Sequence, residues 1–94
     1  MSRIIEELDV ICQFKSDGEI LPIKFRFMNE DGYYKEYKVS GYRKIQINSV
    51  HTTDDGITIG PNDKLYRCRV IDDGRILEVR MYFSVNQCKW RLAI

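Results

Sequence analysis

The chain has little of what catalysis and metal binding require. It has one histidine, His51, and three cysteines, Cys12, Cys68 and Cys88, with no Cys-x-x-Cys pair among them. His51 and Asp54 supply two ligands of a metal site without a third beside them, and nothing marks a base beside Cys88. The phosphate loop, the dinucleotide fingerprint and the Gly-x-Ser-x-Gly elbow are all missing. We therefore expect no catalytic residue, no cofactor and no metal, in a protein that is not an enzyme.

Long apolar runs are missing as well. No stretch approaches the roughly 18 apolar residues of a membrane-spanning helix. The adjacent acids Glu6 and Glu7 stand where a signal peptide would need its apolar segment. The number of cysteines is odd and two of them fall at apolar strand positions, which is typical of reduced core thiols. These features predict a cytoplasmic protein without a membrane partner.

The composition predicts one ordinary globular domain. The chain has 94 residues, of which 44% are hydrophobic and 31% are charged. A typical domain has roughly 100–150 residues, and no change in composition marks an internal boundary. We expect a single domain over residues 1–94.

Four of the six glycines follow an aspartate, at Asp17-Gly18, Asp31-Gly32, Asp55-Gly56 and Asp73-Gly74. Asp-Gly is favoured in tight hairpin turns, and a type I′ turn needs positive φ at both central residues. Each pair is flanked by runs in which apolar and charged residues alternate, as in half-buried strands. The sequence therefore predicts an all-β antiparallel meander of six to seven strands.

The apolar positions of each run share one face, which predicts a single core. Trp90 alternates with Leu92 in the last run and is expected to close that core. Strongly twisted sheets of short strands close on themselves, so a small barrel or open roll is favoured over a flat sheet. Only residues 2–8 fit helical spacing, over about two turns. The residues expected to face inward are Leu8, Val10, Cys12, Phe14, Leu21, Ile23, Phe25, Phe27, Tyr37, Val39, Ile45, Ile47, Tyr66, Cys68, Val70, Leu77, Val79, Met81, Phe83, Trp90, Leu92 and Ile94.

Charge is distributed unevenly although the net charge is only +1. Most of the acids lie in or beside predicted turns, while bases occupy outward strand positions. If these strands are neighbours, one wall of the barrel is basic, and outward tyrosines beside it can stack on nucleobases. Arginine and lysine also cover the solvent face of strands without binding a ligand. The alternative function is nucleic-acid binding, through Arg26, Arg67, Arg69, Arg80, Tyr82, Lys89 and Arg91.

Apolar residues at outward positions indicate a different function. Ile71 and Ile76 flank the same turn and should lie close together. An exposed apolar patch of more than a few hundred Å² marks a protein interface. The function that the sequence favours is a binding module for an unknown protein partner or for a second copy of the chain. The interface expected consists of Ile11, Ile20, Ile71, Ile76 and Tyr82.

Several short motifs span most of the chain, at residues 17–25, 37–39, 65–70 and 89–92. They comprise a Gly-x-x-x-Pro-Ile-x-Phe start, a Tyr-x-Cys-Arg strand and a late tryptophan. In these motifs the chain resembles a group of short, uncharacterised bacterial proteins. The resemblance implies a compact all-β protein of unassigned function in the bacterial cytoplasm, and it transfers no site residue.

Overall fold

The computed structural model describes residues 3–94 and consists of nine β-strands, with no helix in that range. The predicted helical spacing near the start of the chain is wrong, because Ile4 and Ile5 form a short strand; Ser2 lies outside the described residues. The strands are β1 (Ile4–Ile5), β2 (Asp9–Phe14), β3 (Ile20–Met28), β4 (Tyr34–Ile45), β5 (His51–Thr52), β6 (Thr58–Ile59), β7 (Lys64–Asp72), β8 (Arg75–Ser84) and β9 (Lys89–Ala93).

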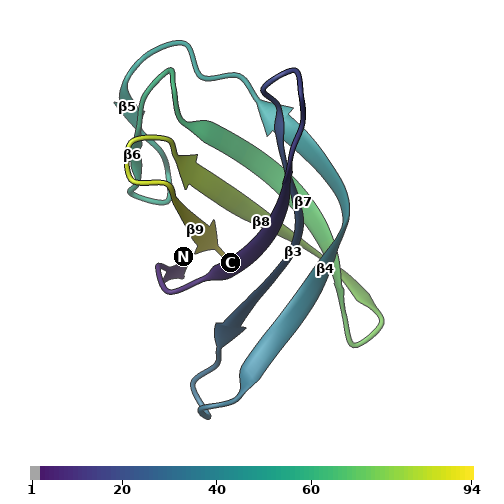
Figure 1. The fold of residues 1–94 in the computed structure, drawn as a ribbon. Helices are drawn as coiled ribbons and strands as arrows, with labels where there is room; N and C mark the ends of the chain where they lie inside the picture. The colour runs from purple at the N-terminus through teal and green to yellow at the C-terminus, as the bar shows by residue number, and fades with distance from the viewer. Residues whose placement is uncertain (1–2) are drawn as a thin grey trace.

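Seven of the strands form one antiparallel sheet, in the order β1-β9-β8-β7-β4-β3-β2. The sheet curls into a half-barrel, so the predicted all-β meander with an open roll is confirmed (Figure 1). Strands β5 and β6 form a separate two-stranded hairpin. Figure 1 shows this hairpin lying beside β8 and β9 rather than extending the sheet.

The two edges of the sheet belong to strands that are neighbours in the chain. Strand β1 pairs with β9 at one edge, and β2 pairs with β3 at the other. Only residues 6–8 connect β1 to β2. A chain of so few residues reaches only about 10–14 Å, so the sheet must curl until its edges approach. Arg3 and Ile94 also lie side by side, because they exchange two backbone hydrogen bonds of 2.9 Å.

Three of the four Asp-Gly turns share one geometry. Gly18 donates its backbone N–H to Lys15 at 3.0 Å, and Lys15 donates to Glu19 at 2.8 Å. This is a three-residue hairpin loop, with glycine in the left-handed conformation after a type I turn. Among residues 3–94, only the turn at Asp73 and Gly74 has positive φ at both residues, 50° and 78°. The type I′ prediction is right for that turn and wrong for the other three.

Two irregularities set which residues face the core. The β2–β3 pairing skips Ile23, whose side chain is consequently 40% exposed although it was expected inside. The β4–β7 pairing skips Ser40, between Val39 and Gly41. A bulge of this kind lets one strand run on with a local change of register. Residues 34–45 therefore form one strand with a bulge at Ser40.

The main core fills the concave face of the sheet. Trp90 is 8% exposed and packs against Phe83, with ring centroids 4.9 Å apart, and against Tyr66, at 5.9 Å. The prediction that Trp90 is a core residue is confirmed. Phe14 points to the same face but lies near the edge of the sheet and is 66% exposed. The buried members of this core are Ile5, Phe25, Phe27, Tyr37, Tyr66, Cys68, Val70, Val79, Met81, Phe83, Trp90 and Leu92.

A second apolar cluster lies on the convex face, so the prediction of a single core is wrong. The segment that carries the β5–β6 hairpin covers this part of the sheet, and its Ile57 and Ile59 pack there. Ile45 and Ile47, expected in the main core, belong to this cluster instead. The buried members are Ile47, Ile57, Ile59, Leu65, Tyr82 and Ala93.

Candidate functional site

Three arginines lie side by side on the convex face. The register of β4, β7 and β8 places Arg43 opposite Arg67, and Arg67 opposite Arg80. Directly opposed residues on antiparallel strands have their Cα atoms about 4.5–5.5 Å apart and point to the same face. Arg69 lies next along β7 on this face, between Gly41 and Glu78. We call Arg43, Arg67, Arg69 and Arg80 the arginine surface.

Gly41 makes room for one of these side chains. A Cβ atom at position 41 would lie 3.2 Å from Nη2 of Arg69, closer than most real contacts. The missing side chain therefore lets the Arg69 guanidinium lie across β4. Arg43, Arg67 and Arg69 line a surface depression of about 240 Å³ together with Tyr42 and Glu78.

Only one arginine of the surface has a carboxylate partner among residues 3–94. Arg80 donates from Nε to Asp55 Oδ2 at 2.7 Å and from Nη2 to Oδ1 at 2.8 Å. The Asp55 side chain is 4% exposed, and its hydrogen bond raises the pKa of Arg80. No ion pair within the described chain involves Arg43, Arg67 or Arg69, all of which are exposed.

Tyr82 is buried, which contradicts both interfaces predicted to contain it. Its side chain is 3% exposed beneath the β5–β6 hairpin, and its hydroxyl donates to Asp55 Oδ2 at 2.5 Å. Burial, followed by the hydrogen bond to Asp55, raises the pKa of Tyr82. The ring therefore offers no surface for a nucleobase or a partner protein.

The predicted basic residues separate into different regions. Arg67, Arg69 and Arg80 come together, as the hypothesis of a basic wall requires. Arg26 lies on β3, where its Nε donates to Asp9 at 2.9 Å and its guanidinium lies 4.6 Å from the ring centroid of Tyr34. Lys89 and Arg91 lie on β9 and do not join the arginine surface.

Arg43 belongs to the surface but the sequence interpretation missed it. The bulge at Ser40 shifts the register so that Arg43 meets Arg67. The available signal was Gly41, because a glycine in the interior of a strand often marks a bulge. Without the pairing partner, no signal places Arg43 beside a particular residue of β7.

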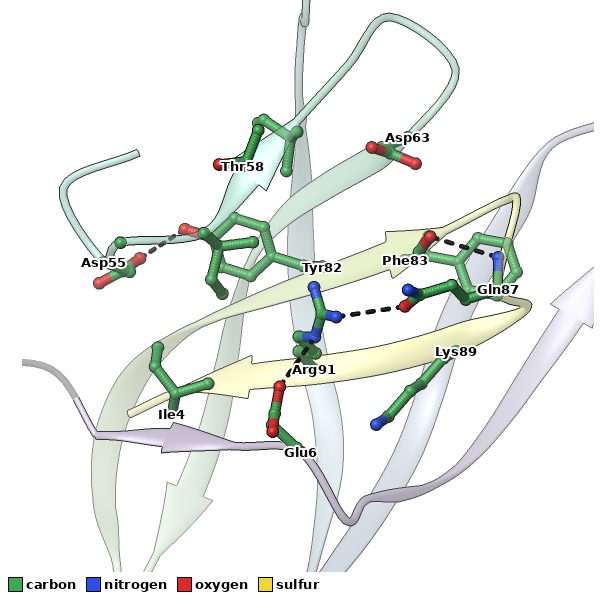
Figure 2. Close-up of a pocket in the computed structure, with 14 residues that line it drawn as sticks. Ile4, Glu6, Asp55, Thr58, Asp63, Tyr82, Phe83, Gln87, Lys89 and Arg91 are labelled. Carbon is green, nitrogen blue, oxygen red and sulfur yellow. Dashed lines mark hydrogen bonds and ion pairs between the residues drawn. The ribbon is translucent and has the colours of Figure 1, made fainter. Parts of the chain in front are cut away.

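Residues of the β8–β9 hairpin and the β5–β6 hairpin line an open cavity of about 470 Å³. Figure 2 shows Arg91 reaching into it between Glu6 and Gln87. Arg91 Nε lies 3.3 Å from Glu6 Oε1, and its Nη2 donates to Gln87 Oε1 at 3.2 Å. Lys89 and Asp63 also line the cavity. Since bases and acids are mixed there, the cavity favours no ligand of one charge.

The predicted apolar interface does not form one patch. Ile71 and Ile76 are direct cross-strand partners, 61% and 74% exposed. Ile11 lies on β2, at the edge of the sheet, with β4 and β3 between it and β7. Ile20 is half-buried and packs against the main core. The interface is thereby reduced to Ile71 and Ile76.

Residues 3–94 bring together no group of three His, Cys, Asp or Glu side chains able to hold a metal ion. His51 Nδ1 lies 3.0 Å from the Ser49 carbonyl oxygen, and Cys88 is exposed. The same residues include no helix with the length and apolar character needed to cross a membrane. No protein-family model, curated protein or solved structure matches the chain.

Proposed function

We propose that the protein is a non-catalytic binding module that holds the phosphate backbone of a nucleic acid on the arginine surface. One observation carries the proposal: Arg43, Arg67 and Arg80 are opposed on three adjacent strands. Like charges placed directly opposite each other destabilise a sheet. Asp55 offsets this for Arg80 alone. A bound polyanion would offset it for the others.

The chemistry of the side chains supports phosphate as the ligand group. Arginine is planar and always charged, and it binds phosphate oxygens in a bidentate manner. Tyr82 is buried, so its ring offers no stacking platform beside these arginines. The Tyr42 ring packs edge-on against Tyr66 of the main core, with centroids 6.1 Å apart. Contacts between arginine and phosphate position a nucleic acid without reading its sequence.

Fluorescence anisotropy with labelled single-stranded and duplex DNA and RNA tests this function. The wild-type protein should bind at low salt, with an affinity that falls steeply as salt is added. Arg67→Glu should weaken binding about tenfold and flatten the salt dependence. Arg75→Glu is the matched control, since Arg75 is exposed on the β7–β8 hairpin away from the opposed row, and it should change the affinity less than about threefold. Absence of wild-type binding at tens of micromolar would overturn the proposal.

A protein interface is the second candidate function. The pair of Ile71 and Ile76 supports it, since two large apolar side chains are exposed and directly opposed at the end of one hairpin. Two residues make a small patch, and single exposed apolar residues are common on protein surfaces. We therefore rank this candidate below phosphate binding.

A further inference from the structure

Strand β2 has a neighbour on one side only. It is the last strand in the sheet order, and no strand formed by residues 3–94 pairs with its other side. A free edge presents a row of unpaired N–H and C=O groups to any chain that can pair with them. Proteins usually protect such edges with lysine or proline, and Asp9–Phe14 contains neither.

The hairpin turn fixes which backbone groups of β2 are free. Lys15 donates its N–H to the Glu19 carbonyl, so the backbone N–H and C=O groups of Lys15 point toward β3. Backbone groups alternate in direction along an antiparallel strand. The N–H and C=O groups of Val10, Cys12 and Phe14 therefore point away from the sheet. Pro22, which has no N–H to donate, stands opposite Cys12, in agreement with this assignment.

Exposed apolar side chains lie along the same edge. Phe14 is 66% exposed and Ile11 is 59% exposed. Phe14 and Val10 lie on the concave face, where they oppose Ile20 and Phe25. Ile11 lies on the convex face, opposite Lys24. A strand added to this edge would cover apolar surface on both faces.

We infer that this edge pairs with the β2 strand of a second copy of the chain, antiparallel and centred on Cys12. In that register Val10 opposes Phe14 of the second copy, Cys12 opposes Cys12, and Asp9 opposes Lys15. All the outward N–H and C=O groups of Val10, Cys12 and Phe14 are satisfied, which gives about six backbone hydrogen bonds between the copies. Each exposed phenylalanine gains an apolar partner.

Charge complementarity supports the second copy as the occupant, and the number of satisfied backbone groups selects Cys12 as the centre. By symmetry the Asp9 and Lys15 pair occurs twice, once at each end of the paired segment. Shifting the centre by one residue, to Ile11, opposes Lys15 to Glu7, but within Asp9–Phe14 it pairs only Val10 with Cys12. The outward backbone groups of Phe14 then have no partner in that strand. Within one chain Asp9 contacts Arg26 and Lys15 contacts Asp17, in exposed ion pairs that exchange readily for others.

Light scattering over a range of concentrations tests the pairing by charge reversal. The wild-type protein should show twice the monomer mass at high concentration. Asp9→Lys opposes two lysines and Lys15→Asp opposes two aspartates, so each should raise the dissociation constant at least about fivefold. The double variant D9K/K15D restores opposite charges and should recover most of the dimer. A monomeric wild-type protein, or a double variant as weak as the single ones, would overturn the inference.

Two further measurements locate the interface. With Cys68→Ser and Cys88→Ser removing the other thiols, mild oxidation should join two chains through Cys12, because opposed residues lie within the Cα separation that a disulfide requires. Cys12→Ser should abolish the covalent dimer. Ile71→Lys should leave the dimer intact, and its loss in that variant would assign self-association to Ile71 and Ile76 instead. Nucleic-acid binding is measured separately, so the two proposals fail independently.

Discussion

Trp90 joins two parts of the main core. Its ring contacts Phe83 on β8 and Tyr66 on β7, and its strand follows the last loop of the chain. The sequence predicted this position from the alternation of Trp90 with Leu92 and Ile94 and from the size of its side chain. The contacts explain why one ring matters, since it fills the space where three strands meet.

Removing the Trp90 ring should therefore be costly. We expect Trp90→Ala to lower the free energy of unfolding by about 3–5 kcal/mol, because a large cavity replaces the ring. Urea denaturation followed by circular dichroism measures the loss. Trp90→Phe keeps most of the apolar volume and should lower the free energy of unfolding by less than half as much as Trp90→Ala. Tryptophan emission near 350 nm in the native protein, with easy acrylamide quenching, would contradict the buried position.

Cys68 should make the free energy of unfolding depend on pH in the alkaline range. Burial raises the pKa of its thiol from 9.0 to about 12. Between these values the unfolded chain releases the proton while the folded chain keeps it, so the free energy of unfolding falls as pH rises. One such group contributes up to about 1.4 kcal/mol per pH unit.

Denaturation series at several pH values test this effect. Cys68→Ala should lower stability at pH 7, because it leaves a small cavity, but it should flatten the decline between about pH 9 and 10. In that window Tyr66 contributes less than Cys68, because burial raises its pKa from 10.0 to about 12 and its effect on stability therefore falls mainly above pH 10. An unchanged slope in the variant would show that Cys68 is not the group responsible.

Among the elements, the β5–β6 hairpin accounts for the largest difference between the predicted and the observed fold. Residues of this segment cover the convex face and bury Tyr82 and Leu65. Met81, Tyr82 and Phe83 are consecutive apolar residues, and all three are buried. Such a run is typical of a strand covered on both faces, and it was the signal for the second cluster.

Asp55 attaches this hairpin to the sheet through Arg80 and Tyr82. We expect Asp55→Ala to cost about 1.5–3 kcal/mol, because hydrogen bonds to a charged group are lost and the Tyr82 hydroxyl keeps only Thr53 Oγ1, at 3.2 Å, as a partner. Amide hydrogen exchange should accelerate at Thr53, whose N–H bonds to Ile57. Asp54→Ala is the matched control at an exposed neighbour and should change neither quantity appreciably. Equal effects of the two substitutions would show that Asp55 does not fix the hairpin.

For the whole molecule, the sequence predicted the fold class because turns and alternation are local. The Asp-Gly pairs placed the hairpins, and consecutive hairpins fix most of the strand order. The sequence did not predict the cover on the convex face, because β5 and β6 have only two residues each and leave little periodic signal. Pro22 and Ser40-Gly41 indicated irregular strand positions, but the sequence did not predict the register changes there, which exchange inward and outward positions beyond them.

The candidate site was predictable in part for the same reason. Arg67 and Arg80 lie on consecutive strands, so their proximity follows from one hairpin. Arg43 reaches them through a pairing between β4 and β7, separated by the whole β5–β6 segment. Sequence periodicity carries no information about a pairing of that range. Tyr82 does not belong to the site for the same reason, since the β5–β6 segment buries it.

The hydrogen bonds between Arg3 and Ile94 have a practical consequence for the chain as an object of engineering. Because these residues are cross-strand neighbours, a short glycine-rich linker between positions 3 and 94 would complete one more hairpin without deforming the sheet. The chain can then be opened in an exposed turn such as the one at Gly32. In this circular permutant β1 and β9 become interior in sequence while every contact of the sheet is retained, and fluorescent labels at the new ends stand away from the arginine surface.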